Sequence, residues 1–281
     1  MTKKRMYQIL SIILMILLAC FFIFPLVWMI SSALKTEAAI YQEMGTWRSF
    51  LPSLNPSEWF LSFQEVFTRF NVVRYTANSV MYALTVTVGS IIVNSLAGYS
   101  FAKFDFKGKK FLFALMIALL VIPGETIMIS KFSIVQKLGL LNSRMAVILP
   151  ILASPLFIYM FTNFFKAIPD EIIESAKIEG ASNFRVFWNV MLPMSKPAIA
   201  TVGTLSFIAS WNDYIWPLMV LTDTEAFPLQ VAITNINNTT PVYTNQVMAI
   251  LTISTIPLIL IYVFFQKYLV QGLGSQGTGV K

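Results

Sequence analysis

Six long stretches of the chain carry almost no charged side chain, and this pattern constrains the fold more than any other feature. The stretches are residues 6–34, 75–102, 111–130, 145–165, 198–222 and 247–265, and only Glu125 and Asp213 interrupt them. A helix that crosses a bilayer needs about 20 apolar residues, because its backbone polar groups must be hydrogen-bonded within the segment. We therefore predict an all-α integral membrane protein with six transmembrane helices.

The distribution of basic residues predicts that both termini are cytoplasmic. With the N-terminus inside, the inner segments hold 13 Lys and Arg residues and the outer segments hold 7, as the positive-inside rule requires. The first apolar run, 29 residues without a charge, is too long for the core of a signal peptide, so it is interpreted as an uncleaved anchor. Four segments are expected, namely a cytoplasmic N-terminus with the first helix at 1–34, an extracytoplasmic loop at 35–74, the main transmembrane module at 75–266 and a cytoplasmic tail at 267–281.

A charged, amphipathic helix-turn-helix is predicted at 168–197, between the fourth and fifth transmembrane helices. Asp170 is expected to cap the first helix, Gly180 to end it in the left-handed conformation, and Ser182 to cap the second helix. The apolar stripe expected on the second helix is Phe184, Phe187, Trp188 and Met191. Pro193 is expected to end that helix, since proline cannot donate the next backbone hydrogen bond.

The first helix of this loop is acidic, which favours a protein partner over a lipid surface. It carries four acids and one base, namely Asp170, Glu171, Glu174, Glu179 and Lys177. Helices that lie on anionic lipid have polar faces rich in Lys and Arg, so a lipid surface would repel this one. We predict that the loop docks into a groove of a soluble cytoplasmic protein, with a position flat on the membrane as the alternative.

Three motifs in the loop resemble the EAA loop of binding-protein-dependent ABC importer permeases. They are Glu174-Ser175-Ala176, then Gly180 four residues later, and Val190-Met191-Leu192-Pro193. Ser175 stands where the family most often has alanine, which is a small-for-small change. The resemblance implies that the loop carries a coupling helix, seated in a cleft of a cytoplasmic ATPase subunit. The docking residues it implies are Glu171, Glu174, Ser175, Ala176, Gly180, Phe184, Leu192 and Pro193.

Softer motifs along nearly the whole chain resemble the carbohydrate-uptake branch of that family. They are Asn78-Ser79, residues 97–102, residues 193–197, Trp211-Asn212-Asp213 and residues 266–272. The resemblance implies a permease subunit of an ATP-driven importer, which translocates a sugar or oligosaccharide delivered by an extracytoplasmic binding protein across a prokaryotic cell membrane. The partners it implies are a second permease subunit, two cytoplasmic ATP-binding subunits, the binding protein and the lipid bilayer.

Two segments are predicted on the outer side of the membrane. In the 35–74 loop, Trp47 and Trp59 together with two prolines suggest a short helical segment on the membrane face. The 223–246 loop contains a run of turn-forming residues and no base. In the resembled family this loop faces the binding protein, which implies contacts at Asn235, Asn238 and Tyr243; a flexible connector is the alternative.

The composition argues against catalysis within this chain. Histidine does not occur, which removes the usual general base, the commonest zinc ligand and the Ser-His pair of hydrolases. The chain also has no glycine-rich phosphate cradle ending in Gly-Lys. No catalytic residue, metal, cofactor or nucleic acid is therefore predicted, and ATP hydrolysis is expected in a separate subunit.

Polar residues within the uncharged stretches are the candidates for a solute pathway. Glu125 and Asp213 are expected at similar depths, roughly 21 to 23 Å from the cytoplasmic edge at 1.5 Å per residue. Because a carboxylate in lipid is costly, we expect both to face a water-filled path, with snorkelling to the outer headgroups as the alternative. Asn94, Trp211 and Asn212 would add hydrogen-bonding groups and an aromatic surface suited to a sugar.

Three other functions remain open from the sequence alone. An ABC importer permease can carry a solute other than a sugar. An ion-coupled secondary transporter could use Glu125 and Asp213 as proton or sodium sites, but the acidic loop would then have no role. A membrane-embedded enzyme could use the same two carboxylates as an acid–base pair, although no histidine is available to assist them.

Overall fold

The protein is helical throughout the part of the chain that the structure describes. The computed structural model describes the backbone of residues 3–238 and 240–274. These residues form helices, turns and loops and no strand, which confirms the all-α prediction. The predicted tail at 267–281 begins inside the last helix, which continues to Gly274, and residues 275–281 of that tail lie outside the described residues.

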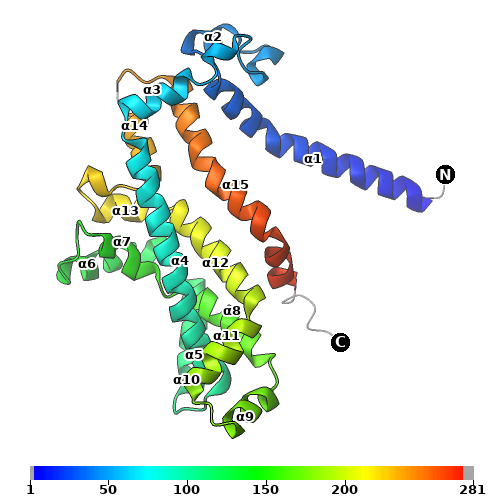
Figure 1. Ribbon diagram of the computed structural model, residues 1–281, viewed down its shortest axis with the longest axis vertical. Coiled ribbons are helices and arrows are strands. Elements are labelled where there is room, and N and C mark those ends of the chain that lie inside the picture. The colour runs from blue at the N-terminus through cyan, green and yellow to red at the C-terminus, as the bar shows by residue number, and fades with distance from the viewer. Residues whose placement is uncertain (1–2, 239, 275–281) are drawn as a thin grey trace. The chain divides into compact units, whose positions relative to one another are not determined.

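The elements are labelled in chain order (Figure 1). The α-helices are α1 (Lys3–Ala33), α2 (Glu37–Gln42), α3 (Leu61–Arg69), α4 (Val72–Lys103), α5 (Lys109–Ala118), α6 (Met128–Lys137), α7 (Arg144–Ile148), α8 (Pro155–Lys166), α9 (Asp170–Ile178), α10 (Asn183–Val186), α11 (Leu192–Met194), α12 (Lys196–Trp211), α13 (Ile215–Val220), α14 (Leu229–Asn237) and α15 (Thr244–Gly274). The short 3₁₀ segments are η1 (Trp47–Phe50), η2 (Pro56–Glu58), η3 (Leu119–Val121), η4 (Gly124–Ile127), η5 (Leu149–Ile151) and η7 (Thr224–Ala226), and η6 (Phe187–Met191) is a π-helix.

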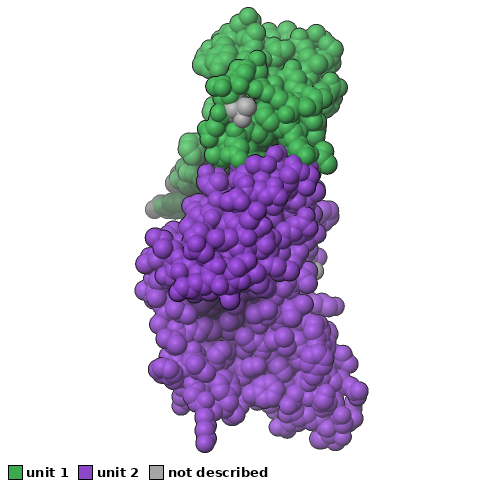
Figure 2. Space-filling model, turned by 90° about the vertical axis from the view of Figure 1, so that its left-hand side faces the viewer, with its two compact units in different colours: residues 1–73, 232–257 green, residues 74–231, 258–281 purple. Residues whose placement is uncertain are grey.

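The chain divides into two compact units (Figure 2). Unit 1 contains residues 1–73 and 232–257, and unit 2 contains residues 74–231 and 258–281. In unit 1 the carboxylate of Glu37 accepts hydrogen bonds from the backbone N–H groups of Thr244 and Asn245, at 2.9 and 3.0 Å. These N–H groups lack partners within α15 because they belong to its first turn, so Glu37 ties α2 to the start of α15.

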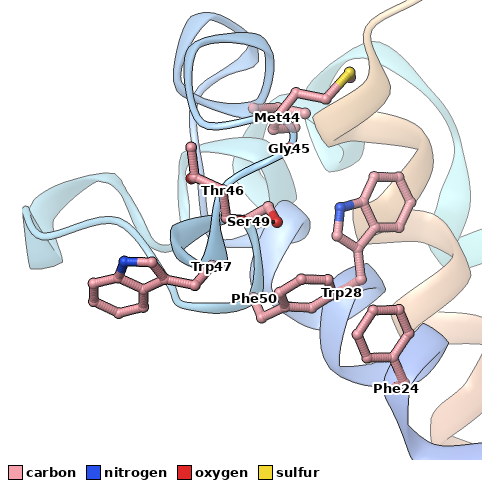
Figure 3. Close-up of a pocket in the computed structure, with 9 residues that line it drawn as sticks. Phe24, Trp28, Met44, Gly45, Thr46, Trp47, Ser49 and Phe50 are labelled. Carbon is pink, nitrogen blue, oxygen red and sulfur yellow. Dashed lines mark hydrogen bonds between the residues drawn. The ribbon is translucent and has the colours of Figure 1, made fainter. Parts of the chain in front are cut away.

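The segment after α1 folds back along that helix within unit 1. The Phe50 ring of η1 lies 4.4 Å from the Phe24 ring of α1, measured between centroids, and Figure 3 shows η1 beside this part of the helix. The Ser31 hydroxyl donates a 2.7 Å hydrogen bond to the Ser49 carbonyl. These contacts hold η1 against the C-terminal turns of α1.

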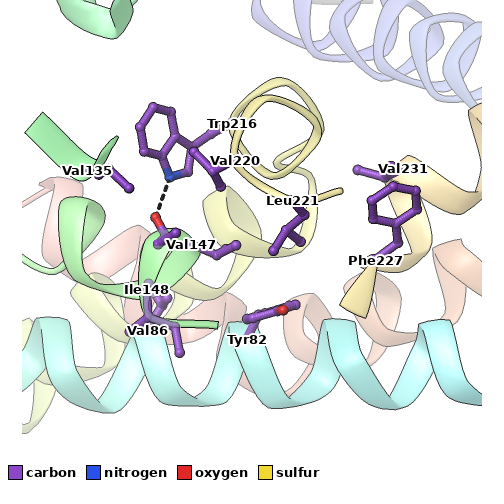
Figure 4. Packing of buried hydrophobic residues seen from close by; sticks show 11 residues of the cluster. Tyr82, Val86, Val135, Val147, Ile148, Trp216, Val220, Leu221, Phe227 and Val231 are labelled. Carbon is purple, nitrogen blue, oxygen red and sulfur yellow. Dashed lines mark hydrogen bonds between the residues drawn. The ribbon is translucent and has the colours of Figure 1, made fainter. Parts of the chain in front are cut away.

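Unit 2 is held together by two apolar clusters. The Trp216 cluster joins α4, α6, α7, α13 and α14, and the indole N–H of Trp216 donates a 3.0 Å hydrogen bond to the Ala146 carbonyl (Figure 4). The Phe187 cluster joins α4, α8 and α12 to the 168–197 loop. Helix α8 also packs against α5 and α12. The loop is therefore built into the packing of the membrane helices.

The structure supports several membrane spans and does not confirm six. Among the described residues, three helices are long and apolar enough to cross a bilayer, at Tyr7–Ala33, Val72–Lys103 and Thr244–Lys267. Two bent pairs bring the number to five if each counts as one span, namely Lys109–Val121 with Gly124–Lys137, at 105°, and Arg144–Ile151 with Pro155–Lys166, at 46°. The predicted fifth span at 198–222 is divided between α12 and α13.

Candidate functional site

The 168–197 loop begins with a helix that is fastened to the end of α4. The sequence predicts that Asp170 caps this helix, and that prediction is wrong. Helix α9 starts at Asp170, so Asp170 is the first residue of the helix and Pro169 occupies the cap position. Its carboxylate instead accepts a 2.6 Å hydrogen bond from the Lys103 ammonium, which also donates to the Ile168 carbonyl at 2.6 Å. The Lys103 side chain is nearly buried. It therefore links the end of α4 to the start of the loop.

The turn between the two loop helices forms as predicted. Gly180 has a φ of +84°, in the left-handed region that glycine occupies without a steric penalty. The Gly180 N–H donates to the Lys177 carbonyl at 2.9 Å, and the Ala181 N–H donates to the Ala176 carbonyl at 3.0 Å. This pair of bonds is a Schellman motif, which satisfies the last carbonyls of α9. The direction of the second helix therefore depends on Gly180.

The second loop helix is capped as predicted but is less regular than expected. The Ser182 hydroxyl accepts a hydrogen bond from the Arg185 N–H at 3.3 Å, which confirms the cap. The π-helix η6 follows α10, and the chain remains helical through Pro193 to Met194. The prediction that Pro193 ends the helix is therefore wrong. The wide turn before Pro193 accommodates the missing donor and the ring, which would break a regular α-helix.

The π-helix also divides the predicted apolar stripe. Phe187 and Met191 are buried, whereas Phe184 is 68% exposed and Trp188 is 37% exposed. The buried half packs on the membrane helices, since the Phe187 ring lies 5.4 Å from the Tyr99 ring of α4. The exposed half forms an aromatic pair, with the Phe184 and Trp188 centroids 6.0 Å apart.

Together these residues give the loop an exposed face that combines apolar and acidic groups. Ile178, at the end of α9, is also exposed, at 88%. Of the docking residues implied by the resemblance, Ala176 and Leu192 are half-buried, and the exposed ones are Glu171, Glu174, Ser175, Gly180, Phe184 and Pro193. We call this surface the loop face. Large apolar groups exposed beside charges are typical of a surface that a protein partner covers.

Two of the predicted pathway residues lie inside the packing. Asn94 is fully buried; its amide nitrogen donates to the carbonyls of Ser90 and Leu152, at 2.6 and 2.8 Å, and its oxygen accepts from the Ser154 N–H at 2.8 Å. It therefore braces α4 against the break that precedes α8. Trp211 is 1% exposed and its ring stacks on Phe207 at 5.8 Å, so neither side chain offers a free surface in this chain.

The other three pathway residues stand at helix breaks. Glu125 is exposed in η4, directly after the break at Ile122 and Pro123 that separates the bent pair. Asn212 is exposed at the end of α12 and donates to the Ile208 carbonyl at 3.0 Å. Asp213 is half-buried, and its carboxylate accepts a hydrogen bond from the Trp216 N–H at 3.3 Å. Polar backbone at membrane depth is tolerated where protein or water satisfies it, so these breaks suit a water-filled path.

The residues proposed to meet a binding protein lie on and after α14. The predicted loop at 223–246 is not only a connector, because α14 forms within it. Asn235 and Asn238 are exposed, and the Tyr243 ring lies 5.4 Å from the guanidinium of Arg69. Arg69 also donates to the Pro241 carbonyl at 3.1 Å. This arrangement fixes part of the segment against α3.

A charged network in unit 1 was not predicted from the sequence. Lys35 is 1% exposed; its ammonium lies 2.7 Å from the Glu43 carboxylate and donates to the Arg48 carbonyl at 2.7 Å. The Lys35 hydrogen bond is the main reason that the pKa of Glu43 lies below its usual value, and Arg48 adds to the effect. The sequence offered no signal for it, because a lysine in an outer loop normally faces water. The network closes the turn that carries η1.

The chain is similar to known proteins over nearly all of its length. Residues 90–275 match the family model described as "Binding-protein-dependent transport system inner membrane component". The arabinooligosaccharides transport system permease protein AraQ of Halalkalibacterium halodurans is 30% identical, over 98% of this chain and 99% of that protein. The sn-glycerol-3-phosphate transport system permease protein UgpE of Yersinia pestis is 33% identical over 70% of each chain.

A solved structure shares the fold. It is the crystal structure of a bacterial ABC transporter involved in the import of the acidic polysaccharide alginate. One chain of that structure matches with a TM-score of 0.84 and 24% identity, over 95% of this chain and 98% of that one. The likeness therefore extends over almost the full length of both chains.

Proposed function

Because the chain belongs to the family of binding-protein-dependent transport system inner membrane components, we propose that it is the membrane-spanning permease subunit of an ATP-driven importer for a sugar or oligosaccharide. The full-length relationship to an arabinooligosaccharide transport permease is the observation that carries the sugar assignment. The chain is a transport component and not an enzyme, like the permeases it is related to.

The loop face is the proposed docking site of a cytoplasmic ATPase subunit. Its support is geometric, since Glu174, Phe184 and Trp188 are exposed on a loop whose buried half packs against α4, α8 and α12. A force applied to the exposed half would therefore reach the membrane helices through rigid contacts. Lys103 provides a second link, from α9 to the end of α4. This is the property that a coupling element needs.

The remaining assembly follows from this role. We propose six transmembrane spans, with the broken helix pairs and the α12–α13 segment counted as one span each, and both termini in the cytoplasm. A second permease subunit completes the pathway and two ATPase subunits drive it. Glu125, Asn212 and Asp213 are the proposed path-lining groups, whereas Asn94 and Trp211 are buried within this chain. A binding protein is proposed to contact Asn235, Asn238 and Tyr243.

Gly180→Val tests the docking role. The left-handed conformation costs a side chain about 1 to 2 kcal/mol, and a Cβ on Gly180 would meet no atom within 4 Å, so the substitution strains only the turn. We expect Gly180→Val to weaken co-purification of the ATPase subunit and to abolish sugar-stimulated ATP hydrolysis. Glu174→Ala is expected to have a smaller effect in the same direction.

Two control variants separate this effect from general damage. Gly180→Asn should retain most coupling, because asparagine tolerates the left-handed region. Gly139→Val introduces the same strain, at a φ of +68° and with no atom within 4 Å, but between α6 and α7; coupling should be unaffected. Wild-type pull-down and hydrolysis by Gly180→Val would show that the loop does not couple.

A second candidate function is import of a phosphorylated polyol. The relationship to a permease for sn-glycerol-3-phosphate favours it. Uptake by vesicles that contain the assembled transporter, measured with oligosaccharides and with sn-glycerol-3-phosphate, distinguishes the two. Transport of the phosphate ester alone would replace the sugar assignment and leave the permease assignment intact.

A further inference from the structure

One face of α3 is bonded to the start of α15, and both segments belong to unit 1. Ser62, Glu65 and Arg69 lie three and four residues apart on α3, so they share one face of that helix. The Ser62 hydroxyl accepts a 3.0 Å hydrogen bond from the Asn245 side-chain amide, and the Glu65 carboxylate accepts one of 2.9 Å from the Gln246 side-chain amide. These bonds join residues 183 and 181 positions apart in the chain.

The third residue of this face, Arg69, holds the turn at residues 240–246. Its guanidinium donates to the Pro241 carbonyl and to the side-chain oxygen of Gln246, both at 3.1 Å. The Tyr243 ring centroid lies 5.4 Å from the guanidinium carbon, within the range of a cation–π contact. A planar guanidinium can serve these three partners at once, whereas the ammonium of a lysine is a point charge on a flexible stem.

The start of α15 is secured without Arg69. The Glu37 carboxylate accepts hydrogen bonds from the N–H groups of Thr244 and Asn245, at 2.9 and 3.0 Å. The first turn of α15 therefore keeps partners for these groups when the guanidinium is removed. Loss of Arg69 should free the turn before the helix and leave the helix itself in place. The guanidinium thus sets the conformation of the turn and not the fold of unit 1.

A turn fixed in this way differs from a flexible connector in what binding costs. A partner that contacts a mobile turn must order it, whereas a turn already held in one conformation binds without that loss of entropy. Tyr243, which contacts Arg69, is one of the residues proposed to meet the binding protein. We propose that Arg69 is a positioning residue that presents this turn to the binding protein and so raises the affinity of the transporter for it. The inference rests on the proposed function, because it requires that this segment contacts a binding protein.

The test measures ATP hydrolysis by the complete transporter in nanodiscs as its sugar-loaded binding protein is added. We expect Arg69→Met to raise the concentration of binding protein that gives half-maximal stimulation by roughly tenfold, the order of the cost of ordering a loop, and to leave the basal and maximal rates unchanged. Arg69→Lys should lie in between, because it keeps the charge and loses the planar fork. Without binding protein, hydrogen exchange of the peptide that contains Val242 and Tyr243 should be faster in Arg69→Met.

Two further variants separate positioning from general loosening. Arg74→Met is the matched control, because Arg74 donates to the Glu225 carbonyl at 3.1 Å, near the other end of the 223–246 segment; it should leave the half-maximal concentration unchanged. Tyr243→Ala should raise that concentration. Tyr243→Ala combined with Arg69→Met should raise it by less than the two separate effects together, since side chains in contact do not act independently.

The outcomes distinguish the positioning role from the proposed function. If the binding protein does not stimulate the wild-type transporter, the proposed function fails and the positioning role fails with it. If the wild type is stimulated and Arg69→Met needs no more binding protein than the wild type, only the positioning role is overturned. An equal increase in Arg74→Met would also overturn it. So would loss of basal hydrolysis or of the partner subunits in Arg69→Met, because either would show that the arginine is needed for folding or assembly.

Discussion

Gly98→Ala is expected to disrupt the contact between α4 and α8, the helix that packs against the 168–197 loop. A Cβ on Gly98 would lie 2.6 Å from the Cβ of Phe161 and 3.0 Å from the backbone nitrogen of Thr162. Carbon atoms in contact are about 3.5 to 4.0 Å apart, so α4 and α8 would have to separate by about 1 Å. The atoms that block the methyl group belong to the backbone of α8 or lie next to it, and no change of rotamer can move them.

The change in folding free energy expected for Gly98→Ala is the difference between two opposing effects. Overpacking of a close-packed interior costs about 1 to 3 kcal/mol, and the upper end applies here because Phe161 and Phe165 are completely buried. Alanine is better than glycine in a helix by about 1 kcal/mol. The net loss of folding free energy is therefore about 2 kcal/mol.

Two other glycines provide matched controls. A Cβ on Gly89 would meet the flexible end of Leu152 at 2.7 Å, and one on Gly203 would meet the end of Ile91 at 3.3 Å. Both tips can rotate away, so Gly89→Ala should be nearly neutral and Gly203→Ala should be stabilising by up to about 1 kcal/mol from helix propensity.

The assay is thermal unfolding of the assembled transporter in nanodiscs, with sugar-stimulated ATP hydrolysis measured in parallel. Gly98→Ala should unfold at the lowest temperature and should lose coupling, because α8 carries Phe165 into the Phe187 cluster. A Gly98→Ala protein as stable as the wild type would refute the reasoning. So would a loss of stability in Gly203→Ala equal to that in Gly98→Ala.

Three further variants, two single and one double, each test a named contact or pair of side chains. Lys103→Met removes the link between α4 and α9 and should lower stimulated ATP hydrolysis more than ATPase binding; equal losses in hydrolysis and pull-down would contradict it. Lys35→Met leaves Glu43 without its main partner and should speed proteolysis near η1. In the wild type, acidification should speed this proteolysis only as the pH falls through the lowered pKa of Glu43. Asp213→Asn combined with Asn212→Ala should reduce sugar uptake with assembly intact, and wild-type uptake would exclude both side chains from the path.

The pH dependence follows from the sign of the shift. Because the pKa of Glu43 is depressed in the folded protein, its ion pair contributes stability above the unfolded pKa and loses it as the folded carboxylate becomes protonated. At neutral and mildly acidic pH, η1 should therefore stay packed against α1 and resist proteolysis.

The sequence by itself determined the features whose causes are local. The absence of charge over long stretches predicts helices in lipid, because the cost of an unpaired charge or backbone group there does not depend on the fold. Gly180 and Ser182 were read correctly for the same reason, since a left-handed turn and a hydroxyl cap involve only neighbouring residues. The motifs around these residues are likewise local, and they resemble the family to which the chain belongs.

Tertiary structure alone decided which polar and aromatic side chains are exposed and which are buried. Asn94 forms hydrogen bonds with Leu152 and Ser154, which lie 58 and 60 positions further along the chain, and Trp211 is buried. The periodicity of the sequence could not predict the burial of either side chain. The π-helix that divides Phe187 from Phe184 and the burial of Lys35 likewise depend on what packs against them. A pattern along the chain reports what each residue prefers, whereas burial is set by partners that are distant in the sequence and meet only in the fold.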